Sequence, residues 1–263
     1  MKVIVITGST RGIGRGLADS FLQSGCAVAI SGRKSADVER VVAELAAGHA
    51  PERVFGYACD VSHFEQVQAL WDVSLARFGQ IDIWINNAGV GRPQLKVWEN
   101  STEDIVAVIQ TNVLGTMFGS KVAVSGMLEQ GFGMVYNMEG LGSDGRYVEG
   151  LALYGTTKYG LRYLNDALVE ETKGTPVKVG TLSPGMVVTD LLVGQYKDRP
   201  AEEWEQAKRI FNILADLPET VVPWMARQIL ENERSGARIT WLTRRRLLWR
   251  FLSARFRKRK VIE

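Results

Sequence analysis

A tyrosine and a lysine stand four residues apart in the segment Tyr154-Gly155-Thr156-Thr157-Lys158. Side chains four residues apart lie on the same face of a helix. A nearby ammonium group favours the phenolate form, so Lys158 is expected to lower the pKa of the Tyr154 hydroxyl toward neutral pH. A tyrosine of that kind can act as a general acid toward a carbonyl oxygen. Taken alone, the spacing favours an ordinary surface pair.

A glycine-rich segment near the start of the chain has the pattern of a phosphate site. Residues 7–14 read Thr-Gly-Ser-Thr-Arg-Gly-Ile-Gly and follow the apolar run at residues 3–6. Small residues let the backbone approach a pyrophosphate, whose charge is stabilised at a helix N-terminus. A tight turn without a ligand is the alternative, but the position after the first strand favours a nucleotide site. The predicted contacts are Gly8, Ser9, Thr10, Arg11, Gly12, Ile13 and Gly14.

The residues after the second apolar run indicate which cofactor is bound. A free ribose 2′-hydroxyl is usually met there by Asp or Glu. Here Arg33 and Lys34 occupy that point, and Arg11 in the glycine segment adds a third positive charge. These groups suit a 2′-phosphate, so NADPH/NADP+ is expected rather than NADH. The alternative is that Arg33 and Lys34 are solvated side chains at a helix start.

The elements that position these residues follow from hydrophobic patterning. Short apolar runs alternate with amphipathic helical stretches, and the runs lie at residues 3–6, 27–30, 54–57, 81–85, 134–137 and 177–182. Parallel neighbours need a crossover connection, so the pattern predicts an α/β fold. We expect one Rossmann-type domain over residues 1–240, with a doubly wound parallel sheet and helices on both faces. Asp60 closes the third run, where it can contact an adenine amino group, cap the next helix near Ser62, or do both.

Length and composition agree with a single domain. The chain has 263 residues, 46% of them hydrophobic and 23% charged, which allows one large core. Two cysteines and two histidines without ligand spacing predict neither a disulfide scaffold nor a metal site. Cys26 and Cys59 are expected to be buried thiols. We see no targeting segment and no uninterrupted apolar run near 20 residues, so we expect a cytoplasmic protein.

Two segments depart from the strand–helix alternation. Residues 190–220 mix charges with apolar side chains, including Leu191, Leu192, Trp204 and Phe211, and are predicted to be a lid over an apolar substrate; an ordinary helix packing face is the alternative. Residues 241–263 carry nine Lys and Arg against one acid, a net +8 in a chain of net +3, so the other 240 residues carry −5.

The basic segment 241–263 has apolar residues at near-helical spacing among its arginines. This composition is typical of a helix that lies on an anionic membrane surface. A helix docked on its own domain or on a sister subunit explains it equally well. No recognition motif supports nucleic-acid binding, and none is expected.

Taken together, these motifs resemble the short-chain dehydrogenase/reductase family over nearly the whole chain. Besides the features above, the resemblance rests on Asn86-Asn87-Ala88-Gly89, Asn112, and Ser183-Pro184-Gly185 followed by Thr189. It implies that Tyr154 protonates the substrate oxygen, that Lys158 tunes Tyr154 and binds the nicotinamide ribose, and that Asn112 holds a water in the proton relay. It also implies a homo-oligomer, a dimer or tetramer. The further cofactor contacts that it implies are Val61, Asn87, Ala88, Gly89, Pro184, Gly185, Val187 and Thr189.

One departure from the family pattern concerns its active-site serine. The family carries a serine about thirteen residues before the tyrosine, and Leu141 holds that spacing here. Ser143, eleven residues before Tyr154, is the nearest hydroxyl and the candidate replacement. Glu139 is also unusual beside such a site. It is a functional group facing the substrate, a loop-bracing acceptor or a solvated side chain, and bracing is favoured.

The same departure resembles the chlorophyll b reductase branch of the family. The matching segments are residues 136–145, with Asn-Met-acid-Gly in place of the usual serines, residues 154–158, and residues 181–192. This resemblance implies NADPH-dependent reduction of the 7-formyl group of chlorophyll(ide) b to 7-hydroxymethyl. Two alternatives remain: a reductase of another bulky hydrophobic aldehyde or ketone, and a non-catalytic NADPH-binding sensor or scaffold.

Overall fold

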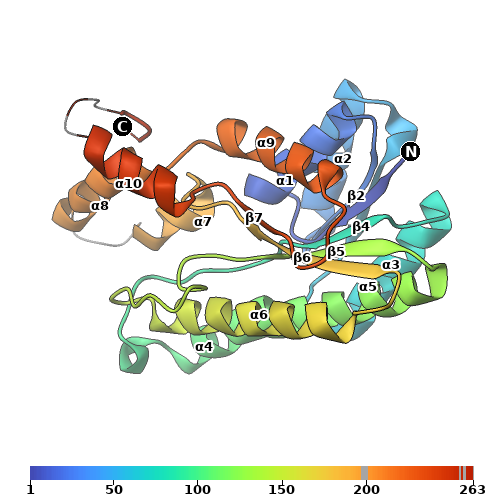
Figure 1. Ribbon diagram of the computed structural model, residues 1–263, viewed down its shortest axis with the longest axis horizontal. Coiled ribbons are helices and arrows are strands. Elements are labelled where there is room, and N and C mark those ends of the chain that lie inside the picture. Colours follow the sequence, from blue (N-terminus) through green and yellow to red (C-terminus); the bar gives the residue numbers. More distant parts are fainter. Residues whose placement is uncertain (197–200, 255, 257–258, 263) are drawn as a thin grey trace.

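The computed structural model describes residues 1–196, 201–254, 256 and 259–262. Its centre is a parallel sheet of seven strands in the order β3-β2-β1-β4-β5-β6-β7 (Figure 1). The strands are β1 (Val3–Ile6), β2 (Ala27–Gly32), β3 (Val54–Ala58), β4 (Ile83–Asn86), β5 (Gly133–Met138), β6 (Val177–Ser183) and β7 (Arg238–Thr240). The doubly wound parallel sheet predicted from the sequence is confirmed. The prediction missed β7, because its three residues include one buried apolar side chain, Ile239, and show no run.

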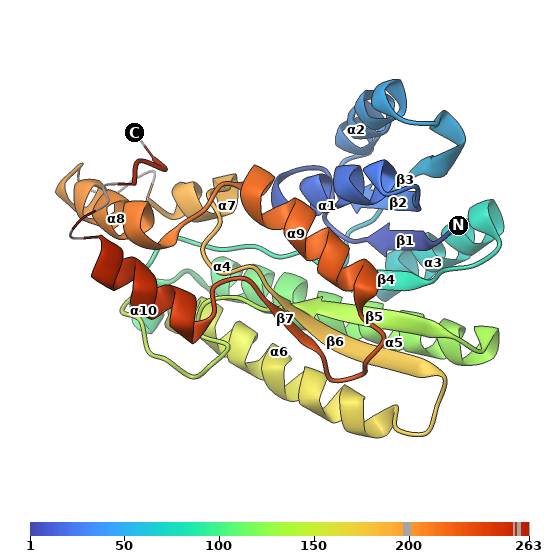
Figure 2. The ribbon, with the colours of Figure 1, turned by 45° about the horizontal axis from the view of Figure 1, so that its top comes forward.

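Helices cover both faces of the sheet (Figures 1 and 2). On one face lie α1 (Gly12–Gln23), α2 (Ser35–Gly48) and α9 (Pro218–Glu231). On the other lie α3 (Phe64–Phe78), α4 (Thr102–Ile109), α5 (Gly115–Gln130) and α6 (Ala152–Glu171). Successive residues of β1 point to opposite faces, so Ile4 and Ile6 join one apolar cluster and Val5 joins the other. Because both faces of the sheet are buried, its strands appear in the sequence as continuous runs of apolar residues.

Short helical turns complete the chain between these elements. They are η1 (Pro51–Arg53), η2 (Val97–Glu99), the π-helical turn η3 (Gln110–Leu114) and η4 (Gly194–Tyr196). The remaining helices are α7 (Asp190–Val193), α8 (Ala201–Leu214) and α10 (Arg244–Ser253). Ser101 caps α4 by accepting a hydrogen bond from the backbone N–H of Asp104 at 3.1 Å. This is the helix start that the Ser-Thr-Glu-Asp pattern at residues 101–104 predicts.

One helical stretch, from Thr102 to Gln130, is both long and apolar. By length and composition this 29-residue helical stretch, in which an 18-residue window has a mean hydropathy of 1.2, is apolar enough to cross a membrane. In the structure it belongs to the layer under the sheet, where Val122, Ala123 and Met127 enter the core. Its apolar character therefore serves packing against β4 and β5. The sequence analysis overlooked it because single polar residues interrupt every apolar run.

The predicted lid, residues 190–220, forms α7, η4 and α8 and then leads into α9. Residues 197–200 of this segment lie outside the described residues. In the predicted extension 241–263, α10 lies beside α8 (Figures 1 and 2), while positions 255, 257–258 and 263 are likewise outside the described part. Both segments lie beyond the carboxyl ends of β4, β5 and β6, the edge at which ligands bind in sheets of this kind.

Candidate active site

Tyr154 and Lys158 lie on the first turns of α6, one helical turn apart, as their spacing predicts. The ammonium nitrogen of Lys158 is 5.6 Å from the centre of the Tyr154 ring and donates a hydrogen bond to the backbone carbonyl of Met138 at 3.0 Å. Met138 is the last residue of β5. The helix and the strand end therefore bring both groups to the carboxyl edge of the sheet.

The pKa of Tyr154 differs from the expectation drawn from the sequence. Burial raises the pKa of Tyr154 to about 12, whereas a lowered pKa was expected from the neighbouring ammonium group. Burial also lowers the pKa of Lys158 to about 8, and the nearby carboxylate of Glu139 partly opposes this effect. Desolvation therefore outweighs the attraction between the two groups. At neutral pH the Tyr154 hydroxyl stays protonated, which is the form that donates a proton.

Asn112 sits in the π-helical turn η3 and is fully buried. Its side-chain oxygen accepts from the backbone N–H of Val90 at 2.8 Å, and its amide nitrogen donates to the Val90 carbonyl at 3.0 Å and to the Thr157 hydroxyl at 3.2 Å. The side chain thus ties the loop after β4 to α6, beside Lys158. With both ends of the side chain engaged, the predicted water-holding role would fall to the backbone of this turn, and π-helical turns are frequent at functional sites.

The loop after β5 changes the interpretation of the missing serine. A Cβ atom at Gly140 would lie 2.5 Å from the Tyr154 hydroxyl, so residue 140, and not Leu141, faces the tyrosine. Leu141 is exposed. The hydroxyl of Ser143 is buried and makes a long contact of 3.5 Å with Oε2 of Glu139. The structure therefore gives Ser143 a partner other than Tyr154, and counting residues back from the tyrosine misplaced the position by one.

Glu139 is a bracing residue, as the sequence analysis favours. Its carboxylate is buried, and Oε2 accepts from Nη2 of Arg238 at 2.5 Å and from Nε of the same residue at 2.9 Å. Arg238 belongs to β7, so its side chain reaches across β6 to the end of β5. The sequence analysis missed Arg238, because nothing local in the sequence links two residues 99 positions apart.

The glycine turn has the shape of a phosphate cradle. Gly8 has a φ of +61°, and a Cβ there would lie 2.7 Å from the Cα of Ala88. A Cβ at Gly14 would lie 2.5 Å from the Asn87 amide nitrogen. No side chain caps the N-terminus of α1, and its first turn holds no acid. This helix end therefore fits an anionic pyrophosphate, which its free N–H groups and dipole would stabilise.

Several predicted cofactor residues shape this cradle through hydrogen bonds within the protein. The Asn87 amide donates to the carbonyls of Thr7 and Gly8 at 2.9 Å each, and the backbone N–H groups of Asn87 and Ala88 donate to the Thr7 hydroxyl. The hydroxyl of Ser9 is buried and donates to the Ile6 carbonyl at 2.7 Å. Gly89 adjoins Asn112 and Lys158. These contacts fix the turn beside Tyr154 and Lys158.

Other predicted cofactor residues line the same edge. Asp60 accepts from the N–H and the hydroxyl of Ser62, at 3.0 and 2.7 Å, and so braces the turn into α3. Val61 is buried against Gly115, and Ile13 packs on the core. Thr10 adjoins Gly32 at the end of β2. The predicted helix start near Ser62 is two residues too early, since α3 begins at Phe64.

Arg33 and Lys34 follow β2 directly and are exposed. Arg11 is exposed as well, and its guanidinium lies 3.7 Å from the carboxylate of Asp190, at the start of α7. Both arginines are thus exposed at this edge. Thr189 approaches the same turn, because a Cβ at Gly12 would lie 3.6 Å from its methyl group. The segment that leads to Thr189 from β6 carries Pro184, Gly185 and Val187.

The apolar residues of the predicted lid divide into two groups. Phe211 is buried in a cluster with Ala207 and Ala215, and its ring centre lies 5.4 Å from that of Tyr196 and 6.1 Å from that of Trp204. It is therefore a packing residue, which is the alternative that the sequence allows. Leu191, at 37% exposure, remains on the surface. Leu192 and Trp204 are half-buried at the edge of the cluster.

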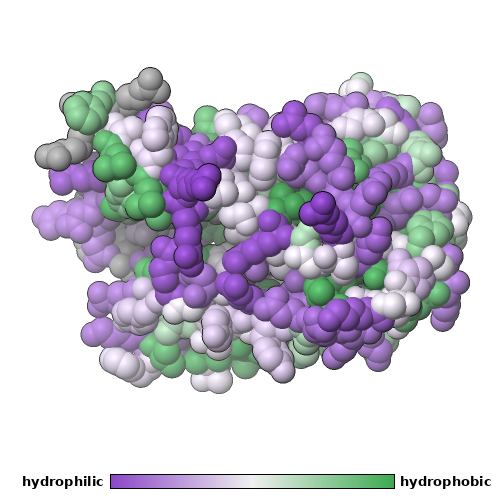
Figure 3. All heavy atoms as spheres, viewed as in Figure 1, coloured by the Kyte–Doolittle hydropathy of each residue, from purple (hydrophilic) through white to green (hydrophobic). Residues whose placement is uncertain are grey.

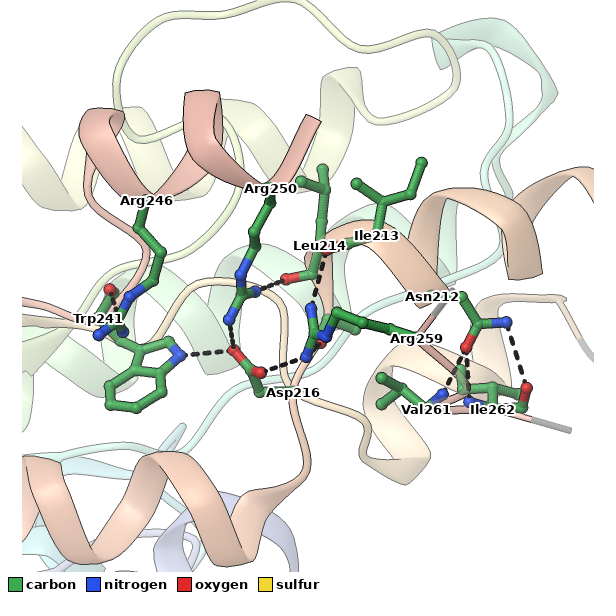
Figure 4. A network of polar contacts seen from close by, with 11 residues as sticks. Asn212, Ile213, Leu214, Asp216, Trp241, Arg246, Arg250, Arg259, Val261 and Ile262 are labelled. Carbon is green, nitrogen blue, oxygen red and sulfur yellow. Dashed lines mark hydrogen bonds and ion pairs between the residues drawn. The ribbon is translucent and has the colours of Figure 1, made fainter. Parts of the chain in front are cut away.

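Asp216, within the segment 190–220, fastens this segment to the C-terminal extension (Figure 4). Its buried carboxylate accepts from Arg250 at 2.6 Å, from Arg259 at 2.7 Å and from the indole of Trp241 at 2.6 Å. Its backbone N–H donates to the Met186 carbonyl at 2.9 Å, in the segment that leads to Thr189. The extension is therefore docked on its own domain, one of the two alternatives left open for it.

Docking leaves an apolar surface on the outside of α10. Arg246 and Arg250 point inward, and Arg246 stacks 3.9 Å from the ring of Trp241 (Figure 4). The opposite side chains, Leu248, Trp249, Phe251 and Leu252, are exposed, with Leu252 at 70%. Figure 3 shows this hydrophobic strip at the left of the molecule, over α10. We call these four residues the α10 strip.

The parallel sheet, the glycine turn at its carboxyl edge and the Tyr154–Lys158 pair beside that turn are together typical of a nucleotide-binding α/β fold. A sequence model of the family described as short chain dehydrogenase matches residues 2–200. The chain belongs to the short-chain dehydrogenase family.

Two relatives from one plant are similar to most of this chain. The probable chlorophyll(ide) b reductase NYC1 of Arabidopsis thaliana, described as chloroplastic, is 35% identical over 271 residues, which cover 97% of this chain and 53% of that protein. The chlorophyll(ide) b reductase NOL of the same plant is 39% identical over 239 residues, covering 89% of this chain and 67% of NOL. The chain thus spans about half the length of NYC1.

Solved structures share the fold. A 3-ketoacyl-(acyl-carrier-protein) reductase from Brucella melitensis, complexed with NADH, superposes with a TM-score of 0.78 at 25% identity, covering 91% of this chain and 96% of that one. ElxO with NADP bound gives the same TM-score, identity and coverage. The predicted fold class is confirmed by these neighbours.

Proposed function

We propose that this protein is an NADPH-dependent carbonyl reductase that reduces the 7-formyl group of a chlorophyll(ide) b-type tetrapyrrole to 7-hydroxymethyl. The observation that carries the reductase assignment is the placement of Tyr154, protonated at neutral pH, one turn from Lys158 at the carboxyl edge of the sheet. The similarity to NYC1 and NOL over most of the chain supports the pigment substrate.

The residues present fit a nicotinamide cofactor. The glycine turn and the uncapped N-terminus of α1 would hold the pyrophosphate, and Arg33 and Arg11 would meet a 2′-phosphate. Lys158 would bind the nicotinamide ribose. When bound, NADPH supplies the hydride that the carbonyl carbon receives. The observation behind this fit is that Gly8 and Gly14 have no side chain, since a Cβ atom at either position would fill the space for the pyrophosphate.

Side chains of the protein itself would supply the proton and would form the substrate site. The Tyr154 hydroxyl donates its proton to the carbonyl oxygen, and the positive charge of Lys158 stabilises the developing negative charge on the phenolic oxygen. A small cavity beside Tyr154, lined by Arg92, Val108, Leu151 and Leu153, among others, has room for about one water molecule. A broad apolar ring would be covered by Leu191, Leu192 and Trp204 of the lid.

The remaining partner predictions are part of this proposal. The α10 strip, flanked by the exposed Arg244 and Arg245, favours peripheral contact with an anionic membrane, from which an apolar pigment can be delivered. Exposed apolar side chains on α4, α5 and α6, including Val106, Met117 and Tyr163, favour a homo-oligomer. The cytoplasmic location stays a prediction.

The test is anaerobic incubation of the purified protein with NADPH and chlorophyllide b, following the pigment spectrum and identifying the product by mass. A gain of two hydrogens by the pigment, absent in Tyr154→Phe although that variant still binds NADPH, is the expected result. A reductase of another bulky aldehyde or ketone would leave the pigment unchanged but reduce other carbonyls. A non-catalytic sensor would reduce none, and its NADPH binding would not depend on Tyr154.

A further inference from the structure

Glu139 occupies a position where its charge acts on the catalytic lysine. Its carboxylate, with a side-chain exposure of 3%, follows Met138 in the chain, and the carbonyl of Met138 accepts the hydrogen bond from the Lys158 ammonium at 3.0 Å. The Glu139 backbone N–H donates to the Leu182 carbonyl of β6 at 2.8 Å. Its main chain is therefore fixed at the tip of the sheet, directly beside the ammonium group.

Arg238 of β7 holds the Glu139 carboxylate through two hydrogen bonds. The two hydrogen bonds from Arg238 converge on one carboxylate oxygen, and Ser143 approaches the same oxygen. A direct, close ion pair with Glu139 would draw Lys158 away from the Met138 carbonyl and from Tyr154. Held by Arg238, the carboxylate acts on Lys158 through its field alone, in a buried region where such fields are weakly screened.

We propose that Glu139 and Arg238 form a positioning pair for Lys158: the anchored carboxylate keeps the ammonium group charged, while Arg238 leaves that group free for its hydrogen bond at the end of β5. The inference rests on the proposed reductase function, in which Lys158 must be positive beside Tyr154. In the described part of the chain, the titratable groups that bear on Lys158 are Glu139, Arg238 acting through it, and Tyr154.

This role extends beyond bracing. Burial alone favours the neutral amine, and the field of Glu139 opposes that loss of charge. A merely structural brace would lower activity equally at every pH. A positioning pair instead sets the pH at which Lys158 loses its proton, so removing the carboxylate must move that pH downward.

The test measures Lys158 directly. Competitive labelling of the purified protein with acetic anhydride across a pH series, read by peptide mass spectrometry, yields the pH at which Lys158 becomes reactive. We expect Glu139→Gln to shift this midpoint down by about 1 pH unit relative to the wild type. In Glu139→Asp, which keeps the negative charge, the Lys158 midpoint should lie close to the wild-type value. Asp144→Asn is the matched control, since it removes a carboxylate from the same loop that is ion-paired with Arg146, and leaves the midpoint unchanged.

The double variant Glu139→Gln/Arg238→Gln guards against misfolding, because it removes both charges and leaves neither buried alone. Its midpoint is also expected to fall. An unchanged Lys158 midpoint in a folded Glu139→Gln or double variant overturns the inference. With chlorophyllide b and NADPH, the alkaline limb of kcat/KM should move by the same amount as the midpoint. If no carbonyl is reduced by the wild type, the proposed function fails, while the labelling still decides the role of Glu139.

Discussion

The position of a Cβ atom at Gly140 lies 2.5 Å from the hydroxyl oxygen of Tyr154. Any side chain at residue 140 would therefore have to displace the proposed proton donor or be displaced by it. Glycine leaves this side of the tyrosine open. The carbonyl oxygen of a large, flat substrate can then approach Tyr154 without meeting a side chain from this loop.

Gly140→Ala should consequently lower kcat for the reductase reaction by about 10-fold or more, since small displacements of a catalytic group are costly. The fold should persist, because the atom that the new methyl group meets is the far end of a side chain. Steady-state kinetics and thermal unfolding measure the two effects. Leu141→Ala, at an exposed neighbour in the same loop, is the control and should change kcat little. Full activity in Gly140→Ala would show that Tyr154 reacts from another position.

Arg33 should decide between the two nicotinamide cofactors. Its guanidinium is exposed at the end of β2 and is expected to pair with the 2′-phosphate. Arg33→Ala should raise KM for NADPH by about 10-fold and leave KM for NADH nearly unchanged, with no loss of stability. The comparison of kcat/KM for both cofactors measures this. A parallel loss with both cofactors would refute a role in recognising the phosphate.

Asp216 should contribute strongly to stability. In Asp216→Asn the buried guanidinium of Arg250, with 8% of its side chain exposed, loses its counter-charge, at a cost of about 3 kcal/mol in the free energy of unfolding. Denaturant unfolding measures this cost. Glu44→Gln is the control, since its ion pairs with Arg15 and Arg40 are on the surface and should matter little. Equal stability of the two variants would mean that the network in Figure 4 does not hold the extension.

The α10 strip should carry any membrane contact. The double variant Trp249→Ser/Leu252→Ser removes two exposed apolar side chains and leaves the inward contacts of Arg246 and Arg250 in place. Its co-sedimentation with vesicles containing anionic lipid should fall several-fold, and wild-type binding should weaken with added salt. Trp98→Ser, at an exposed site in η2, serves as the control. Binding that survives the double variant would place the contact elsewhere.

Deleting the whole extension would be a weaker experiment. Asn212 of α8 receives hydrogen bonds from the backbone N–H groups of Val261 and Ile262, and Arg259 donates to the Ile213 carbonyl (Figure 4). Truncation at residue 244 would therefore disturb the lid as well as remove the α10 strip. Point substitutions on the outer face separate the two effects.

Local sequence determined the parallel sheet, the glycine turn and the pairing of Tyr154 with Lys158. Each of these depends on spacing within one strand, one turn or one helix, where side-chain direction follows directly from residue number. Their positions in the structure agree with the predictions. The sequence analysis placed Leu141 opposite Tyr154, whereas the structure places Gly140 there. The loop after β5 has no regular period from which the direction of a side chain follows.

Tertiary structure alone decided the rest. The Glu139–Arg238 pair crosses β6 between residues 99 positions apart, and Asp216 gathers arginines from 34 and 43 positions away. The basic extension illustrates the reason most clearly. From composition alone, the arginines of this extension are expected to face an external partner. In the structure the buried carboxylate of Asp216 holds Arg250 and Arg259 inward. The reason is that an unpaired charge in the interior is far more costly than an exposed leucine.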